Sequence, residues 1–283
     1  QGLQKSVTDN SGGIQDFIQI ISGDYGHLVS GDSGVSIWTN YPGFTIYYPD
    51  IANSNTSFSL DFPGDGYLWI APLMNHPESP NKAILGGGGI SGGNHLIELT
   101  KAGNQIIYHE QDYNFSNTVS AIGCSPINSS YRYVLTQNGK FYYSSDDGNN
   151  WTMTSSFTGP DGHYFYGSTI WASQEQLGRV FIGGSGYSNP AVYVSDNHGQ
   201  TFIDMDNGLP NTLVFQLESN LNEDILFAAT EVGPYGYSFY ENEWFLLSGI
   251  SAPDQTYWTV DYISEINTAR FGTYGRGIWD FIL

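Results

Sequence analysis

One short apolar segment recurs along this chain at nearly constant spacing, and this repeat restricts the fold more than any other feature. The five copies are centred on Ile84, Val134, Phe181, Phe227 and Arg270, so consecutive copies are 50, 47, 46 and 43 residues apart. A polar turn precedes each copy, and a glycine-containing loop and further strand-like segments follow it. Each repeat of roughly 45 residues therefore holds about four short strands.

The composition also favours strands. The chain has 283 residues, with 21 Tyr, 16 Phe and 7 Trp, whose flat side chains suit half-buried strands, and 35 Gly for turns. Four strands per repeat of this length is the make-up of one propeller blade. We therefore predict an all-β fold, a β-propeller of four-stranded antiparallel blades, with about five to six blades in this chain.

The register of the repeat divides the chain into blades. They are predicted at residues 17–62, 67–113, 117–157, 163–206, 213–248 and 256–283, and residues 1–16 are assigned to the end of an upstream blade or to a closing strand. The last blade has three strand-like segments and no fourth. Because a closed ring needs the missing strand from elsewhere, we expect this chain to be part of a larger propeller.

Two tight turns share one residue pattern. A serine is followed by Asp or Asn two residues later, by Gly four residues later and by an aromatic residue seven residues later; the two sets are Ser144, Asp146, Gly148 and Trp151, and Ser195, Asn197, Gly199 and Phe202. The Asp or Asn side chain can accept backbone N–H bonds across such a turn, and glycine adopts the left-handed conformation. These residues are predicted to stabilise turns.

This pattern resembles the Asp-box, or bacterial neuraminidase repeat, of the propellers of sialidases, xyloglucanase-type glycosidases and sortilin. The resemblance covers about residues 17–283. It implies that each box joins the third and fourth strands of a blade, away from the usual ligand face. The chain looks most like secreted Bacteroidetes repeat proteins, which often carry a sorting domain for type IX secretion, so a secreted, extracellular or cell-surface location is expected.

Charge and cysteine content exclude several classes of partner. The chain carries 28 acidic and 8 basic residues, a formal net charge of −20, which disfavours nucleic acid and anionic membrane surfaces. No apolar run is long enough to span a membrane. Cys124 is the single cysteine, which fits an exported bacterial protein without disulfides. The six His residues lack paired ligand spacing, so no metal site is predicted, although acidic loops such as Asp146-Asp147 could hold Ca²⁺.

Candidate site residues lie on the loops that face the central channel of a propeller. These loops are expected at 86–95, 107–116, 152–166, 183–190, 203–212, 229–236 and 272–277. The side chains that could bind a ligand there are Tyr113, His163, Tyr187, Tyr235, Tyr274 and Arg276, and Trp258 is a further ring that could stack on a sugar. For Arg276 the preferred interpretation is a buried pair with a neighbouring acid, and ligand binding is the alternative.

The sequence leaves catalysis undecided. A glycosidase needs two carboxyl groups, and Asp112 or Asp161 with Glu231 are the weak candidates. A sialidase is disfavoured, because three of the four arginines fall within or beside second strands. Three hypotheses remain: a non-catalytic propeller that binds protein or glycan at the channel-facing loops, a polysaccharide-active glycoside hydrolase of the xyloglucanase type, and a scaffold within a larger secreted or surface assembly. The first is favoured.

Overall fold

The computed structural model describes residues 2–6, 16–23, 26–41, 43–61, 68–87, 91–163, 167–247 and 252–283. Within these ranges the chain is all β, apart from two single-turn 3₁₀ segments, η1 (Ser91–Gly93) and η2 (Ser264–Ile266). It divides into two compact units, one containing residues 1–120 and the other residues 121–163 and 167–283. Each unit is considered by itself below.

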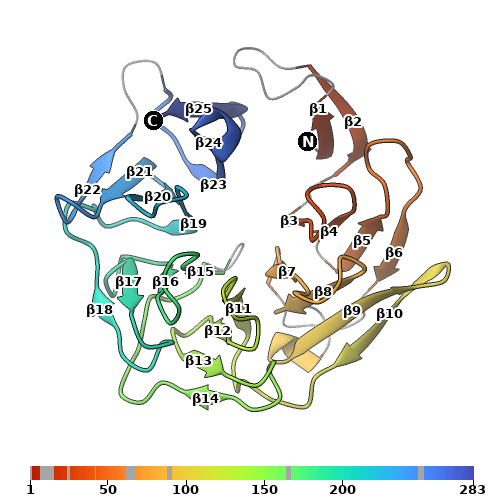
Figure 1. Cartoon of the computed structure of the whole chain (residues 1–283), viewed down its shortest axis with the longest axis horizontal. Helices are drawn as coiled ribbons and strands as arrows, with labels where there is room; N and C mark the ends of the chain where they lie inside the picture. Colours follow the sequence, from red (N-terminus) through yellow and green to blue (C-terminus); the bar gives the residue numbers. More distant parts are fainter. Residues whose placement is uncertain are drawn as a thin grey trace. The chain divides into compact units, whose positions relative to one another are not determined.

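The first unit holds two four-stranded antiparallel sheets whose strands follow one another in chain order (Figure 1). One sheet comprises β3 (Leu28–Val29), β4 (Ile37–Tyr41), β5 (Phe44–Tyr48) and β6 (Phe58–Asp61). The other comprises β7 (Leu73–Asn75), β8 (Lys82–Gly86), β9 (Leu96–Ala102) and β10 (Gln105–Glu110). Buried residues of both sheets, among them Trp38, Leu85 and Ile97, form one apolar core between them.

The second unit repeats this arrangement. Its sheets are formed by β11 (Val119–Cys124, which begins in the first unit), β12 (Arg132–Thr136), β13 (Phe141–Ser144) and β14 (Thr152–Met153); by β15 (Thr169–Ala172), β16 (Val180–Gly183), β17 (Val192–Ser195) and β18 (Ile203–Asp204); by β19 (Val214–Ser219), β20 (Ile225–Thr230), β21 (Gly233–Ser238) and β22 (Glu243–Leu246); and by β23 (Tyr257–Ile263), β24 (Thr268–Thr273) and β25 (Ile278–Ile282). The last sheet has three strands in the described part of the chain. The predicted β-propeller of four-stranded antiparallel blades is therefore confirmed.

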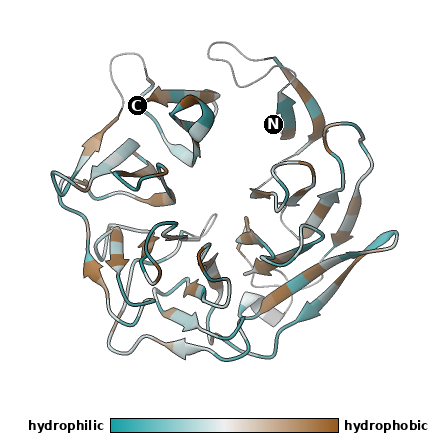
Figure 2. Ribbon diagram, viewed as in Figure 1, coloured by the Kyte–Doolittle hydropathy of each residue, from teal (hydrophilic) through white to brown (hydrophobic). Residues whose placement is uncertain are grey.

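The repeated apolar segment forms the second strand of five successive sheets, β8, β12, β16, β20 and β24. Sheets of a propeller pack face to face, so an inner strand is buried on both faces and its sequence is continuously apolar instead of alternating. Ile84, Val134, Phe181 and Phe227 have no exposed surface. In Figure 2 the hydrophobic residues lie mainly in the strands, and the connecting turns are mostly hydrophilic.

Neighbouring first strands touch one another within the second unit. β15 contacts β19, and β19 contacts β23, so three consecutive blades meet along their first strands. This contact brings the loops that precede these strands to one end of the three sheets. The candidate site described below is built at that end.

One segment differs from the predicted blade boundaries. β2 (Phe17–Ser22), placed by the sequence at the start of the blade 17–62, pairs with β1 (Gly2–Ser6) in a separate two-stranded sheet. The sheet of that blade starts at β3 instead. Leu3 of β1 packs with Ile46 and Tyr48 of β5, so the small sheet lies on the apolar face of its neighbour.

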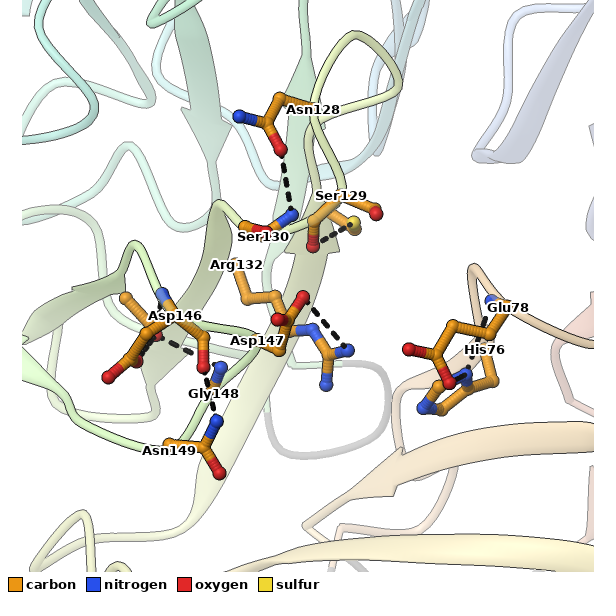
Figure 3. Close-up of polar contacts among 12 residues, drawn as sticks. His76, Glu78, Asn128, Ser129, Ser130, Arg132, Asp146, Asp147, Gly148 and Asn149 are labelled. Atoms are coloured by element: carbon orange, nitrogen blue, oxygen red, sulfur yellow. Dashed lines mark hydrogen bonds and ion pairs between the residues drawn. The ribbon is translucent and has the colours of Figure 1, made fainter.

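Both Ser-x-Asp turns join a third to a fourth strand and have the same hydrogen bonds. In the first, the Ser144 hydroxyl donates to Asp146 Oδ1 (2.8 Å) and accepts the Gly148 N–H (3.0 Å), while Asp146 Oδ1 accepts the Asn150 N–H (2.9 Å). Gly148 has φ +84°, in the left-handed region. Asp147 lies between Asp146 and Gly148, and its Oδ1 is 3.9 Å from Nη2 of the Arg132 guanidinium (Figure 3).

The second turn substitutes Asn for Asp without changing the network. The Ser195 hydroxyl donates to Asn197 Oδ1 (2.9 Å) and accepts the Gly199 N–H (2.8 Å), and Asn197 Oδ1 accepts the Thr201 N–H (3.0 Å). The side chains of Ser144, Asp146, Ser195 and Asn197 are therefore engaged in hydrogen bonds within their own turns. This accounts for a structural role.

We expect Ser195→Ala to lower the free energy of unfolding by about 2 kcal/mol, because the buried N–H group of Gly199 and the half-buried N–H group of Asn197 lose their acceptor. Urea denaturation followed by tryptophan fluorescence measures the loss. Ser145, which is exposed in the other turn, is the control, and Ser145→Ala should change stability by less than about 0.5 kcal/mol. Equal effects of the two substitutions would contradict the role assigned to the Ser195 hydroxyl.

A third turn of this kind was missed by the sequence analysis. The Ser30 hydroxyl donates to Asp32 Oδ1 (3.0 Å) and accepts the Gly34 N–H (2.7 Å), and Asp32 Oδ1 accepts the Ser36 N–H (2.8 Å). This turn joins the first and second strands of its sheet, β3 and β4. The first three positions of the pattern, Ser30, Asp32 and Gly34, were visible in the sequence. The residue seven positions after Ser30 is Ile37, however, and not an aromatic residue.

Candidate ligand-binding site

A belt of backbone hydrogen bonds connects three of the predicted loops in the second unit through Leu213. The Ser185 N–H donates to the Asp161 carbonyl (2.9 Å), and Ser185 also forms a β-bridge with Leu213. The Glu231 N–H donates to the Leu213 carbonyl (3.0 Å). These bonds hold the loops that contain Asp161, Tyr187 and Glu231 next to one another.

The belt continues into the last sheet. The Thr256 hydroxyl donates to the Glu231 carbonyl (3.2 Å), and the Tyr274 N–H donates to the Thr256 carbonyl (3.1 Å). Loops from successive blades are thus fixed against each other mainly by main-chain groups, with the Thr256 hydroxyl as one link, and this restricts their movement more than side-chain contacts alone. A site built on them is preorganised.

Four rings form a row across these blades. His163 and Phe215 meet edge to face with ring centroids 5.8 Å apart, and Phe215 lies 6.0 Å from Trp258. Trp258 and Tyr274 are stacked, with centroids 5.1 Å apart and planes within 18°. His163, Phe215 and Trp258 are half-buried, whereas Tyr274 is 63% exposed. The row therefore presents ring surface to solvent.

Two β-bulges place the central rings of the row. In the pairing of β19 with β20, Val214 faces Thr230 and Gln216 faces Ala229, so Phe215 is the extra residue. In the pairing of β23 with β24, Tyr257 faces Thr273 and Thr259 faces Gly272, so Trp258 is the extra residue. A bulge redirects the side chain of its extra residue, and bulges are common beside functional sites.

A hydrogen-bonded acid lies beside the row. The Tyr187 hydroxyl donates to Glu231 Oε2 at 2.6 Å, and this bond to a carboxylate raises the pKa of Tyr187. Burial lowers the pKa of His163, and the nearby charge of Glu231 partly opposes that shift. His163 is therefore mainly neutral at pH 7, with one ring nitrogen that donates and one that accepts.

This arrangement suits a ligand with both flat apolar faces and hydroxyl groups. Aromatic rings supply stacking area, while a carboxylate, a phenol and a neutral imidazole supply a few oriented hydrogen bonds. Sugar rings combine these two properties. Among the described residues, no group of three or more His, Cys, Asp or Glu side chains is arranged to hold a metal ion.

The structure brings together some of the predicted site residues and separates others. His163, Tyr187, Glu231, Trp258 and Tyr274 belong to the cluster described above. Asp161 contributes its backbone carbonyl to the belt, and the residue is exposed. The pairing of Asp161 with Glu231 as two catalytic carboxylates stays a prediction.

Three other predicted residues have different surroundings. Tyr235 packs against the buried core that contains Trp171 and Trp244. Asp112 and Tyr113 belong to the first unit, where Tyr113 meets Phe115 edge to face at 4.9 Å. The contacts of Tyr113 and Tyr235 are therefore packing contacts with neighbouring side chains.

The buried ion pair expected for Arg276 is not found in the described part of the chain. Arg276 is exposed, and the acid nearest in sequence, Asp280, instead pairs with Arg270 at 2.7 Å. The reason is strand register: Arg270 and Asp280 face each other across β24 and β25. Arg276 lies beyond the end of this pairing, in the turn between the two strands.

Phe215 was missed by the sequence analysis. It follows Leu213-Val214 and looks like one more residue of a buried strand, because an apolar run gives no sign of a bulge. The signal that was available is its position at the start of a first strand, which corresponds to Trp258 in the next blade. Aligning the repeats on their first strands would have identified it.

No protein-family model and no curated protein matches this sequence. Among solved structures, the chain is similar to a GH74 enzyme from Niastella koreensis (16% identity, TM-score 0.64, covering 89% of this chain and 42% of that one) and to an ancestral GH74 enzyme (15% identity, TM-score 0.65, covering 91% and 36%). It is also similar to the β-propeller domain of Cps50 (Swd1) from Myceliophteria thermophila (7% identity, TM-score 0.69, covering 95% and 86%).

These likenesses concern the fold. The chain spans less than half the length of either GH74 enzyme, and all three identities are low. Propellers of this kind support unrelated functions, so activity has to be argued from the site. Fold and likenesses together define the chain as a β-propeller protein. No helix in the described part of the chain has the length and apolar character needed to cross a membrane.

Proposed function

We propose that this chain is a non-catalytic glycan-binding module of a secreted or cell-surface protein. The observation that carries the proposal is the row His163, Phe215, Trp258 and Tyr274, with the Tyr187–Glu231 pair beside it. Successive sugar units of an oligosaccharide could stack along such a row while their hydroxyl groups bond to the polar pair. The two bulges and the backbone belt hold the rings before the ligand arrives.

The proposal includes membership of the Asp-box group of propellers and export from the cell. Two turns, of Ser144 and of Ser195, join third to fourth strands with matching hydrogen bonds and support the group. Export is supported by the acidic surface and by the single thiol, Cys124, which forms no disulfide. Each of these points is secondary to the site.

We expect Trp258→Ala to weaken oligosaccharide binding at least tenfold, because a central stacking ring of the row is removed. Isothermal titration calorimetry with a panel of α- and β-linked oligosaccharides, neutral and acidic, measures this loss. The matched control is Tyr240→Ala, an aromatic residue of the same unit that is 89% exposed in the turn after β21. Binding by no member of the panel, or equal binding by Trp258→Ala and wild type, would contradict the proposal.

Glycoside hydrolysis is the second candidate, favoured by the likeness to two GH74 enzymes. A hydrolase of this type needs an acid and a second carboxylate on opposite sides of the scissile bond. Glu231 is one carboxyl group beside the row, already bonded to Tyr187. Incubating the same oligosaccharides with the protein and measuring new reducing ends decides between the two, since any enzymatic release favours the hydrolase.

A further inference from the structure

The surroundings of all eight cationic side chains are described by the structure, and they are not alike. Seven have a partner within the chain: Lys5 with the carbonyls of Ile51 and Ala52, Lys82 with Glu98, Lys101 with the carbonyl of Gly103, Lys140 with Thr158, Arg132 with Asp147, Arg179 with Asp196, and Arg270 with Asp280. For Arg276, the described residues provide no side-chain hydrogen bond or ion pair.

This difference is unexpected in so acidic a chain. With 28 acidic residues and 8 basic ones, nearly every cation has an acid or a carbonyl at hand. Arginine is also the residue whose planar guanidinium matches a carboxylate with two parallel hydrogen bonds. An exposed arginine left without a partner beside a ring cluster is thus a candidate for binding an anionic group.

The backbone of Arg276 is held in place although its side chain is exposed. The Thr273 N–H donates to the Gly277 carbonyl (3.0 Å), and the Arg276 N–H donates to Thr273 Oγ1 (3.1 Å). The Trp279 indole N–H donates to the Arg276 carbonyl (3.0 Å). The turn that carries Arg276 is therefore closed at both ends and anchored to β25.

The same turn carries Tyr274, the ring at the end of the row. One residue, Gly275, separates Tyr274 from Arg276, so their Cα atoms are at most about 7 Å apart. An arginine side chain has a comparable length. A group attached to a sugar that stacks at Trp258 and Tyr274 thus lies within reach of the guanidinium.

We propose that the glycan bound at this site carries a uronic-acid carboxylate, which Arg276 binds while the sugar rings stack on the aromatic row. This inference rests on the proposed glycan-binding function and specifies its ligand class. The net charge of −20 does not oppose it at physiological salt, because charges more than about 8 Å away are largely screened and the contact with Arg276 is direct. Glu231 accepts a hydrogen bond from Tyr187, and its charge acts on His163, which is at the other end of the row from Tyr274.

The test compares an acidic ligand with its neutral ester and with a neutral glycan. Oligogalacturonides, their methyl esters and cello-oligosaccharides are titrated calorimetrically into wild type, Arg276→Gln and Arg276→Lys. Arg179→Gln is the control, because it removes the same charge from the same unit at a side chain paired with Asp196. A sulfated galactan oligosaccharide separates a carboxylate from other anions.

For wild type we expect the free acid to bind at least tenfold more tightly than its methyl ester, as charge-assisted hydrogen bonds require. Arg276→Gln should lose this preference and bind acid and ester alike, Arg276→Lys should keep part of it, and Arg179→Gln should keep all of it. Equal binding of acid and ester by wild type, or unchanged preference in Arg276→Gln, would overturn the inference, as would tighter binding of the sulfated ligand. If the inference is overturned but a cello-oligosaccharide or an ester still binds in a way that depends on Trp258, the proposed glycan-binding function stands. If no sugar binds, both the uronic-acid inference and the glycan-binding function are contradicted.

Discussion

Gly199→Ala is expected to lower the free energy of unfolding by about 3–4 kcal/mol, the largest effect of any single methyl group added to the Ser-x-Asp turns. Gly199 has φ +82°, and a Cβ built there would lie 2.0 Å from Cε1 of Phe141. Phe141 is fully buried against Tyr133 and Phe202, so its ring has no free space to enter. Backbone strain and overpacking therefore add.

Two further glycines separate these contributions. Gly34 occupies the same position in the turn of Ser30, with φ +84°, and Gly275 lies in the second unit with φ +86°; neither has an atom within 4 Å of a built Cβ. Alanine at either position should cost only the backbone strain, about 1–2 kcal/mol. Urea denaturation of the three variants measures the difference, and equal losses would show that the contact with Phe141 is unimportant.

The repeat could be predicted because its signals are local. A strand buried on both faces leaves a continuous apolar run, as in Leu226-Phe227-Ala228-Ala229, and a left-handed turn needs Gly at a fixed offset from Ser. Each signal depends on residues that are neighbours in sequence. The five second strands and two of the turns therefore follow from the sequence.

The site was predicted less completely, because its geometry depends on pairing between strands. Tyr274 and Glu231 were candidates simply as an aromatic and an acidic residue on the expected loops, and Trp258 was one as a ring that could stack on a sugar. Phe215 was not, because the bulge that redirects it is set by the register of β19 against β20. The partner of Arg270 is likewise fixed by register, which is why Asp280 was unavailable to Arg276.

The second large effect concerns pH and Glu218. This carboxyl group lies on β19, where it accepts a hydrogen bond from the Trp171 indole (3.1 Å). Burial raises the pKa of Glu218 from 4.5 to about 7, the Trp171 bond partly opposes this, and the charge of Asp261 on β23 raises it further. Asp261 in turn faces Arg270 and Glu265, and burial raises its pKa as well.

The sign of the effect follows from proton binding. Below pH 4.5 the Glu218 carboxyl is protonated in both the folded and the unfolded chain, so it contributes no pH dependence. Between pH 4.5 and 7 the unfolded chain has lost this proton and the folded chain retains it, so stability falls as pH rises. Above pH 7 the carboxyl is ionised in both states, and the free energy of unfolding stays lower by about 3 kcal/mol, which corresponds to the shift of the Glu218 pKa.

Wild-type protein alone would conceal this effect. Burial lowers the pKa of His27, in the first unit, from 6.5 to about 4. Between pH 4 and 6.5 His27 is therefore protonated in the unfolded chain and neutral in the folded chain. Because the unfolded state binds more protons, this group makes the free energy of unfolding rise with pH over that range. The two slopes oppose each other over most of the same range, so the contribution of Glu218 has to be isolated by substitution.

Glu218→Gln isolates it, because glutamine retains an acceptor for the Trp171 indole but carries no charge at any pH. We expect the variant to match wild type near pH 4.5 and to be more stable by about 3 kcal/mol at pH 8, with the difference growing mainly between pH 5 and 7. Urea denaturation at a series of pH values gives this difference curve, from which the contribution of His27 cancels. Glu241→Gln, at an exposed carboxyl in the turn before β22, is the control and should change stability by less than about 0.5 kcal/mol. A pH-independent difference for Glu218→Gln would mean that the substitution changes packing along β19 and that the folded protein does not hold the proton.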